Sequence, residues 1–209
     1  MAFCKHFQRD LQPGAIPHNT ESLIAVENHA TGMTAFLTAH AGGSYENGLY
    51  RIYPTSQMSR WTEVVVEAFP EFRERICCFA FDWLGRVFAL DFARRTDDQY
   101  LVLMLEPGTG QALEIPTTFM QFHEQELVGY RNEALAAEFF QAWRASGGNT
   151  PAFEQCVGYK KPLFLGGSDT IENLEVIDMD VYWSVFEQLP SKVRDLPECT
   201  RLGNIQVNE

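Results

Sequence analysis

Dense runs of β-forming residues dominate the middle of the chain. The segments ICCFAFD (76–82), RVFALDF (86–92), YLVLMLE (100–106) and QALEI (111–115) each have the composition of a strand. The tetrad Asp82-Trp83-Leu84-Gly85 and the stretches ARRTDDQ and PGTG lie between them as turns. Connections this short do not allow parallel crossovers, so the pattern predicts an antiparallel meander.

Helical spacing precedes the meander. Residues 21–40 have helical potential, and LYRIY after the turn AGGSYENG has the pattern of a short strand. Ser56 is the expected N-cap of a helix that ends near Phe69-Pro70. The apolar residues of that helix share one face at i, i+3, i+4 and i+7: Trp61, Val64, Val65 and Ala68.

Further helices follow the meander. Thr117 is expected to cap a helix over 119–128, and Asn132 a second helix with Leu135, Phe139 and Trp143 on one stripe. After the break SGGNTP, the sequence predicts a short strand, a Gly-Gly turn, a second short strand and a helix from the cap Asp178 to Leu189. LQPGAIPHNT is predicted to be a loop and the last twenty residues an extended tail. This order of elements predicts the α+β class, with a central antiparallel sheet and helices flanking it before and after.

Charge is distributed unevenly over the 209 residues. The net charge is -12, with -2 in residues 1–75 and -10 in residues 76–209. An acidic surface repels phosphate, so the composition argues against nonspecific binding to nucleic acid or to an anionic membrane. The negative net charge is compatible with binding to a basic partner.

Cysteine usage and hydropathy favour a cytoplasmic protein. The five cysteines are odd in number and include no C-x-x-C pair, which is typical of a reducing compartment. No run approaches the roughly 18 apolar residues of a membrane span, and we expect no secretion signal at the N-terminus.

No motif indicates catalysis, a cofactor or a metal. Ser168 follows Gly166-Gly167 but lacks the G-x-S-x-G arrangement of a nucleophile elbow, and the same stretch lacks the G-K-[ST] ending of a phosphate loop. Cys4 and His6 lie close in sequence, yet no second pair of ligands matches them. In the predicted strand, Cys77 and Cys78 point to opposite faces, one of them into the core. We therefore expect no enzyme.

An acidic stretch near the C-terminus is the strongest candidate for binding. Between Pro162 and Ser191 there is no Lys or Arg. Its acidic residues include Asp169, Glu172, Glu175, Asp178 and Asp180. Asp178 and Asp180 are sufficiently explained by the favourable dipole at a helix N-terminus. The sharper hypothesis is an acidic surface that steers a basic partner, with Tyr182, Trp183 and Phe186 beside it.

Two stretches resemble known families. Residues 42–92 resemble the bacterial GAD-like domain through Asn47-Gly48-Leu49-Tyr50-Arg51, Trp61, Ala68-Phe69-Pro70 and Asp82-Trp83-Leu84-Gly85-Arg86. Residues 157–189 are very similar to the C-terminal domain of immunity proteins for type VI secretion DNase effectors. The matching residues are Gly158-Tyr159-Lys160, the run Pro162–Gly167, Asp169-Thr170, Glu172-Asn173-Leu174, Asp178-Met179 and Val181-Tyr182-Trp183. The architecture also resembles SUKH-like immunity proteins.

The resemblance implies a GAD-like region over 1–150 and an immunity-protein region over 151–209, packed on one body. It also implies a non-enzymatic protein that binds a co-encoded toxin in the cytoplasm and blocks its active site or its folding. A DNase needs a basic surface to hold DNA, which suits an acidic inhibitor. We expect contacts through Asp169, Glu172, Glu175, Asp178 and Asp180, and secondarily through Asp82 and Trp83.

One alternative is a ligand- or peptide-binding sensor or scaffold with a pocket among Tyr50, Trp61 and Trp83. The oligomeric state is left open by the sequence.

Overall fold

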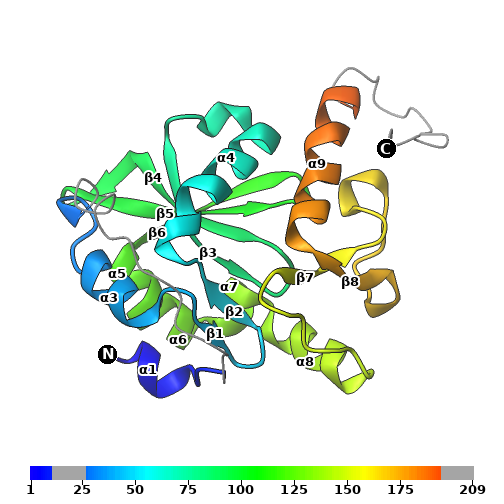
Figure 1. The fold of residues 1–209 in the computed structure, drawn as a ribbon, viewed down its shortest axis with the longest axis horizontal. Coiled ribbons are helices and arrows are strands. Elements are labelled where there is room, and N and C mark those ends of the chain that lie inside the picture. Colours follow the sequence, from blue (N-terminus) through cyan, green and yellow to red (C-terminus); the bar gives the residue numbers. More distant parts are fainter. Residues whose placement is uncertain (11–26, 194–209) are drawn as a thin grey trace.

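Two antiparallel sheets organise residues 1–10 and 27–193, the parts of the chain that this computed structural model describes (Figure 1). In the six-stranded sheet, each strand pairs with the next along the chain, which confirms the predicted meander. Its strands are β1 (Ser44–Tyr45), β2 (Tyr50–Ile52), β3 (Ile76–Asp82), β4 (Val87–Thr96), β5 (Gln99–Glu106) and β6 (Gln111–Thr118). The smaller sheet pairs β7 (Gln155–Tyr159) with β8 (Leu174–Asp178).

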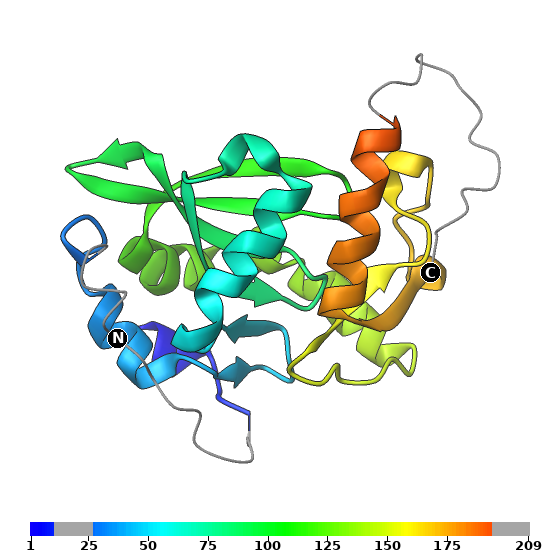
Figure 2. The same ribbon diagram turned by 45° about the horizontal axis from the view of Figure 1, so that its top comes forward.

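Helices cover both faces of the larger sheet, as the α+β prediction requires. Figure 2 shows α4 lying across one face with α9 beside it, while the helical segment after β6 lies behind the sheet. The described helices are α1 (Phe3–His6), α3 (Met33–His40), α4 (Met58–Ala68), α5 (Phe119–Gln121), α6 (Leu127–Gly129), α7 (Arg131–Leu135), α8 (Ala137–Ala145) and α9 (Met179–Val193). None of them combines the length and apolarity that crossing a membrane requires.

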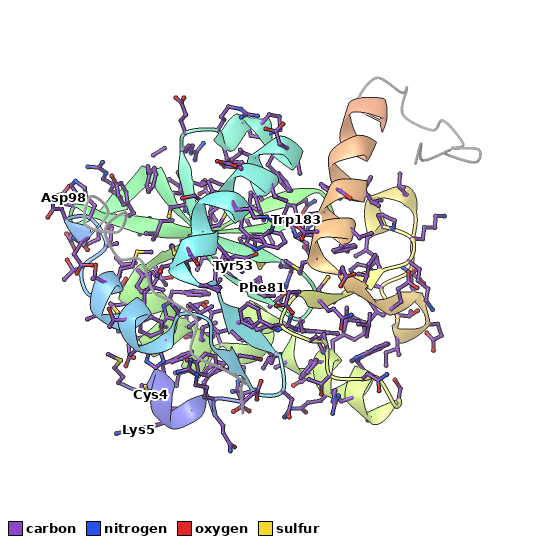
Figure 3. The ribbon with its side chains drawn as sticks, viewed as in Figure 1. Cys4, Lys5, Tyr53, Phe81, Asp98 and Trp183 are labelled. Atoms are coloured by element: carbon purple, nitrogen blue, oxygen red, sulfur yellow. The ribbon has the colours of Figure 1, made fainter. Side chains whose placement is uncertain are left out.

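Aromatic rings link the sheet to its covering helices. Tyr53 stacks on Phe81 of β3 with 4.6 Å between ring centroids (Figure 3). It also stacks on Trp61 of α4, with 5.2 Å between centroids. On the opposite face, Phe88 of β4 lies 5.1 Å from Phe122, in the π-helical turn Phe122–Glu126. Core side chains therefore pack on both faces of the sheet.

Strand β4 is longer than its sequence pattern predicts. The stretch ARRTDDQ was expected to be a turn, but β4 continues to Thr96, and only Asp97 and Asp98 turn, with φ of 47° and 59°. Arg94 lies inside the strand because its guanidinium binds the Asp91 carboxylate at 2.9 Å and the Val102 carbonyl at 2.5 Å. A carboxylate within β4 and a carbonyl of the neighbouring strand β5 thus hold a polar segment in the sheet.

Two predicted helix caps and the continuity of one predicted helix are corrected. Ser56 lies in the 3-10 turn Thr55–Gln57, and α4 begins after it without a side-chain cap. Thr118, not Thr117, caps α5, in a reciprocal capping box with Gln121. The predicted helix after Asn132 is interrupted at Ala136, with φ of 49°.

Asn132 has a different capping role. Its Oδ1 accepts a hydrogen bond from the amide of Glu138 at 3.0 Å, so it caps α8 across the break. Near the N-terminus, α3 confirms the later part of the helix expected over residues 21–40. The loop predicted over residues 11–20 and most of the predicted C-terminal tail lie outside the described residues.

Candidate partner-binding surface

The β7–β8 sheet is fixed to the larger sheet through the β3–β4 hairpin. The Val157 amide in β7 donates to the Trp83 carbonyl at 2.6 Å. The indole Nε1 of Trp183 in α9 donates to the Gly85 carbonyl at 3.0 Å. These two bonds attach β7 and α9 to the hairpin that joins the central strands β3 and β4.

Arg51 of β2 forms a second attachment, which the sequence did not reveal. Its fully buried guanidinium donates from Nη1 to the carbonyls of Ala152 at 3.1 Å and Gln155, and from Nη2 to that of Gly48 at 2.9 Å. Burial lowers the pKa of Arg51 to about 10, so the side chain is still cationic at neutral pH. A planar fork of donors thereby joins β2 to the segment that enters β7.

The Gly-Gly-Ser stretch is a turn held by one side chain. Asn173 Nδ2 donates to the carbonyls of Lys161 at 2.8 Å and Ser168 at 2.9 Å, while its Oδ1 accepts from the Lys161 amide at 3.0 Å. A Cβ on Gly167 would lie 1.9 Å from the Lys161 carbonyl oxygen. This geometry supports the structural role that we predicted for the glycines.

All five acidic residues predicted to contact a partner are exposed: Asp169, Glu172, Glu175, Asp178 and Asp180. They lie on the loop before β8, on β8 itself and on the first turn of α9. The fold therefore brings the whole predicted set to the surface of the β7–β8 region.

Their charges are not equally available. Arg60 of α4 pairs with Asp180 at 2.5 Å, and the Tyr159 hydroxyl donates to Asp169 at 2.7 Å. Within the described ranges, Glu175 and Asp178 form no ion pair. The uncompensated part of the acidic surface is thus centred on β8.

The two remaining predicted contact residues are fully buried, which corrects that part of the expectation. The Asp82 carboxylate binds the Arg86 guanidinium at 2.6 Å and accepts the amide of Leu84 at 3.0 Å. Trp83 donates from Nε1 to the Leu135 carbonyl at 2.9 Å and packs against Phe140. Both side chains stabilise the β3–β4 hairpin from the interior, so neither is exposed for contact with a partner.

The alternative pocket among Tyr50, Trp61 and Trp83 is also corrected, because all three side chains are packed in the core. Tyr50 hydrogen-bonds His123 at 2.9 Å, and Trp61 stacks on Tyr53. Two surface grooves, of about 790 and 920 Å³, are lined by other residues.

The geometry gives little support for a reactive cysteine or for a metal site. Burial raises the pKa of Cys77 to about 11 and that of Cys78 further, so both thiols are protonated at neutral pH. Exposed Cys4 lies 3.5 Å from His40 Nε2, a neighbour that the sequence spacing could not reveal. Among the described residues, no three His, Cys, Asp or Glu side chains are arranged to hold a metal ion.

Comparisons with known proteins give one fold match and one family match. The crystal structure of Atu4351 from Agrobacterium tumefaciens matches with a TM-score of 0.58 and 14% identity, covering 88% of this chain and 86% of that one. This likeness shows a shared fold. No curated protein matches the sequence.

The family match covers residues 116–190, which fit the model described as T6SS immunity protein Tdi1, C-terminal. This range runs from the end of β6 into α9 and includes all five exposed acidic residues. The resemblance of residues 42–92 to GAD-like domains and the division near residue 150 stay predictions. The C-terminal part of the chain is thus similar to the C-terminal region of a type VI secretion immunity protein.

Proposed function

We propose that this protein is an immunity protein that binds and neutralises a cognate type VI secretion toxin, a basic nuclease, in the cytoplasm. The observation that carries the proposal is the family match over residues 116–190, the segment that builds the exposed acidic surface. The protein acts by stoichiometric binding and not by catalysis.

Electrostatics supports a nuclease as the partner. A nuclease holds its substrate by a cationic surface, since phosphate contacts dominate the affinity for DNA. The exposed carboxylates of Glu175 and Asp178, which form no ion pair among the described residues, are available to pair with such a surface. Opposite charges also accelerate association by steering the encounter. Inhibition then follows from competition with DNA for the same cationic side chains.

Coexpression with the toxin encoded beside this gene tests the function. We expect cells that make both proteins to survive and to keep intact DNA, whereas cells that make the toxin alone lose viability. Equal killing with and without this protein would refute the proposal. The two proteins should also copurify as a complex.

Charge reversal tests the surface separately. We expect Glu175→Lys with Asp178→Lys to slow association with inactivated toxin by about tenfold and to weaken its dependence on salt. Glu133→Lys with Glu138→Lys is the matched control, because these two acids are also exposed but lie on α7 and α8. Equal effects of the two pairs would argue against a specific surface on β8.

A further inference from the structure

A groove of about 920 Å³ lies between α4 and α9, which Figure 2 shows side by side on one face of the larger sheet. One wall is a stripe of α4 at the i, i+3, i+4 and i+7 positions: Arg60, Glu63, Val64 and Glu67. The other wall is formed by the first turns of α9, through Asp180, Val181 and Ser184. The groove follows α4 for about 10 Å, since a helix rises about 1.5 Å per residue.

Two valines give the groove an apolar lining. Val64 is half-buried and packs against the core. Val181 is 48% exposed and is one of four large hydrophobic side chains that are exposed within the described ranges. Water covers this apolar surface in the free protein, so a partner that displaces the water stabilises a complex there.

Two ion pairs neutralise most of the charge in the groove. Arg60 binds Asp180 at 2.5 Å, which joins α4 to α9, and Arg73 binds Glu67 at 2.7 Å. Glu63 lies between Arg60 and Glu67 on the stripe and is exposed. It forms no ion pair within the part of the chain that the structure describes. The groove therefore presents one uncompensated carboxylate beside two valines.

The walls of the groove restrict the kind of segment that it can hold. A helix bonds most of its amides and carbonyls internally, so α4 and α9 offer side chains to a partner and not the row of main-chain groups that a strand edge offers. An extended segment would lose the hydration of its own main chain there without gaining partners. A helix keeps its main-chain bonds when it is buried, and a groove between two helices accepts its apolar face.

Charge restricts the partner further. A Lys or Arg side chain can lay its methylene stem on the valines while its cation reaches Glu63. A second copy of this chain, with a net charge of -12, would be repelled. The groove also adjoins the exposed acidic residues of β8 and α9, because Asp180 belongs to both sets. A basic protein thus meets favourable charge in the groove and beside it.

We infer that the α4–α9 groove is the docking site for an amphipathic helix of the partner protein that carries Lys or Arg. The stem of the basic residue packs on Val64 and Val181, and its cation pairs with Glu63. This inference rests on the proposed function and adds a binding site to it. One wall of that site, α4, lies outside residues 116–190, which match the family model.

Filling the groove tests the inference. Ser184 is exposed, and its hydroxyl donates to the carbonyl of the residue three positions earlier at 2.9 Å. We expect Ser184→Trp to weaken the binding of catalytically inactive toxin by at least about tenfold. Ser146→Trp is the matched control, because Ser146 is also exposed and makes the same kind of bond at 2.7 Å, but lies at the end of α8. The control should bind within about twofold of the original.

The outcomes separate the inference from the proposed function. Equal affinity of the two tryptophan variants overturns the inference and leaves the proposed function intact. Failure of the original protein to bind the toxin refutes the proposed function itself. Thermal midpoints of both variants, measured by circular dichroism, verify that each is folded.

Removing one charge gives a measurement that does not depend on filling the groove. Glu63→Gln keeps the size of the side chain, and we expect it to weaken binding by about threefold and to reduce the dependence of binding on salt. Glu133→Gln is the matched control, because Glu133 is exposed on α7 and is not part of the groove. Equal effects of the two substitutions would contradict the pairing with Glu63.

The original protein supplies a third measurement. A soluble nitroxide should broaden the methyl signals of Val181 in the free protein, and bound toxin should protect them. The methyl groups of Val157, which is 0% exposed, are the internal reference. Broadening that persists in the complex overturns the inference. Protection that is already present in the free protein would show that this chain or a second copy fills the groove, and it would overturn the inference as well.

Discussion

The indole of Trp183 reaches the main chain of Gly85, donating from Nε1 to the carbonyl oxygen at 3.0 Å. These residues are 98 positions apart, and both lie in the interior of the protein. Gly85 has φ of 75°, and a Cβ there would lie 2.9 Å from the sulfur of Cys156. The absence of a side chain at Gly85 therefore lets β7 and α9 approach the hairpin that joins β3 to β4.

Trp183→Phe should destabilise the protein by about 1–3 kcal/mol, because it leaves the Gly85 carbonyl unpaired and removes buried volume. Urea denaturation followed by circular dichroism measures the change. Tyr130→Phe is the control, since Tyr130 is 58% exposed and should change stability by less than about 0.5 kcal/mol. Equal effects at the two positions would contradict the role given to the indole.

Arg51→Lys should loosen the segment that leads into β7. An ammonium group cannot reproduce the planar fork that binds the carbonyls of Ala152, Gln155 and Gly48 at once. We expect a loss of about 2–5 kcal/mol, with faster proteolysis near residues 150–155 than elsewhere. Arg60→Lys is the matched control at the exposed pair with Asp180, which should cost about 1 kcal/mol or less.

His123 should make stability decline in acid. Its Nδ1 donates to the Phe119 carbonyl at 2.8 Å, so Nε2 is the acceptor for the Tyr50 hydroxyl at 2.9 Å. Burial lowers the pKa of His123 to about 3, so the folded protein keeps this ring neutral where the unfolded chain, with a pKa of about 6.5, takes up a proton. The contribution is complete above about pH 6.5 and declines by up to about 1.4 kcal/mol per pH unit below it.

The double variant His123→Phe with Tyr50→Phe removes this titration and replaces both polar partners by apolar rings. Its free energy of unfolding should decline less steeply than that of the original protein between pH 6 and pH 4. Asp91 affects both proteins equally. Although burial acts to raise its pKa, hydrogen bonds from Arg75 and Arg94 lower it overall, so its contribution is lost as the pH falls below about 4. Parallel profiles would exclude His123 as the source of the slope.

Gly167→Ala should disrupt the turn between β7 and β8, because the new Cβ would lie 1.9 Å from a main-chain oxygen that cannot move away freely. We expect a loss of more than about 2 kcal/mol and a lower thermal midpoint. Gly129→Ala makes the same chemical change in α6, where no atom lies within 4 Å of the added Cβ, and it should be neutral or slightly stabilising.

The sequence predicted the meander most closely. Strand β3 matches its predicted bounds, and β5 differs only by one residue at its start, because runs of apolar β-formers specify strands wherever both faces are buried. The continuation of β4 through Arg94 was missed, since the Val102 carbonyl that binds this arginine comes within reach only when β4 pairs with β5. The break at Ala136 was missed for a related reason, because the periodicity of the apolar residues continues across it.

The residues of the candidate surface were also predicted only in part from the sequence. Local sequence was enough to predict that Glu175 and Asp178 are exposed, since carboxylates without partners stay in water. It could not separate Asp82 from them, because only the fold brings Arg86 and the main-chain amides around this carboxylate and compensates its burial.

By itself, the sequence determined the α+β class, the order of the strands and the acidity of the C-terminal region, all of which follow from local pattern and composition. The tertiary structure decided that Glu175 and Asp178 form no ion pair among the described residues, that Arg51 binds the segment leading into β7, and that Asp82 and Trp83 are buried. These properties depend on contacts between main-chain groups and side chains that are far apart in the sequence. A local sequence pattern does not show such contacts.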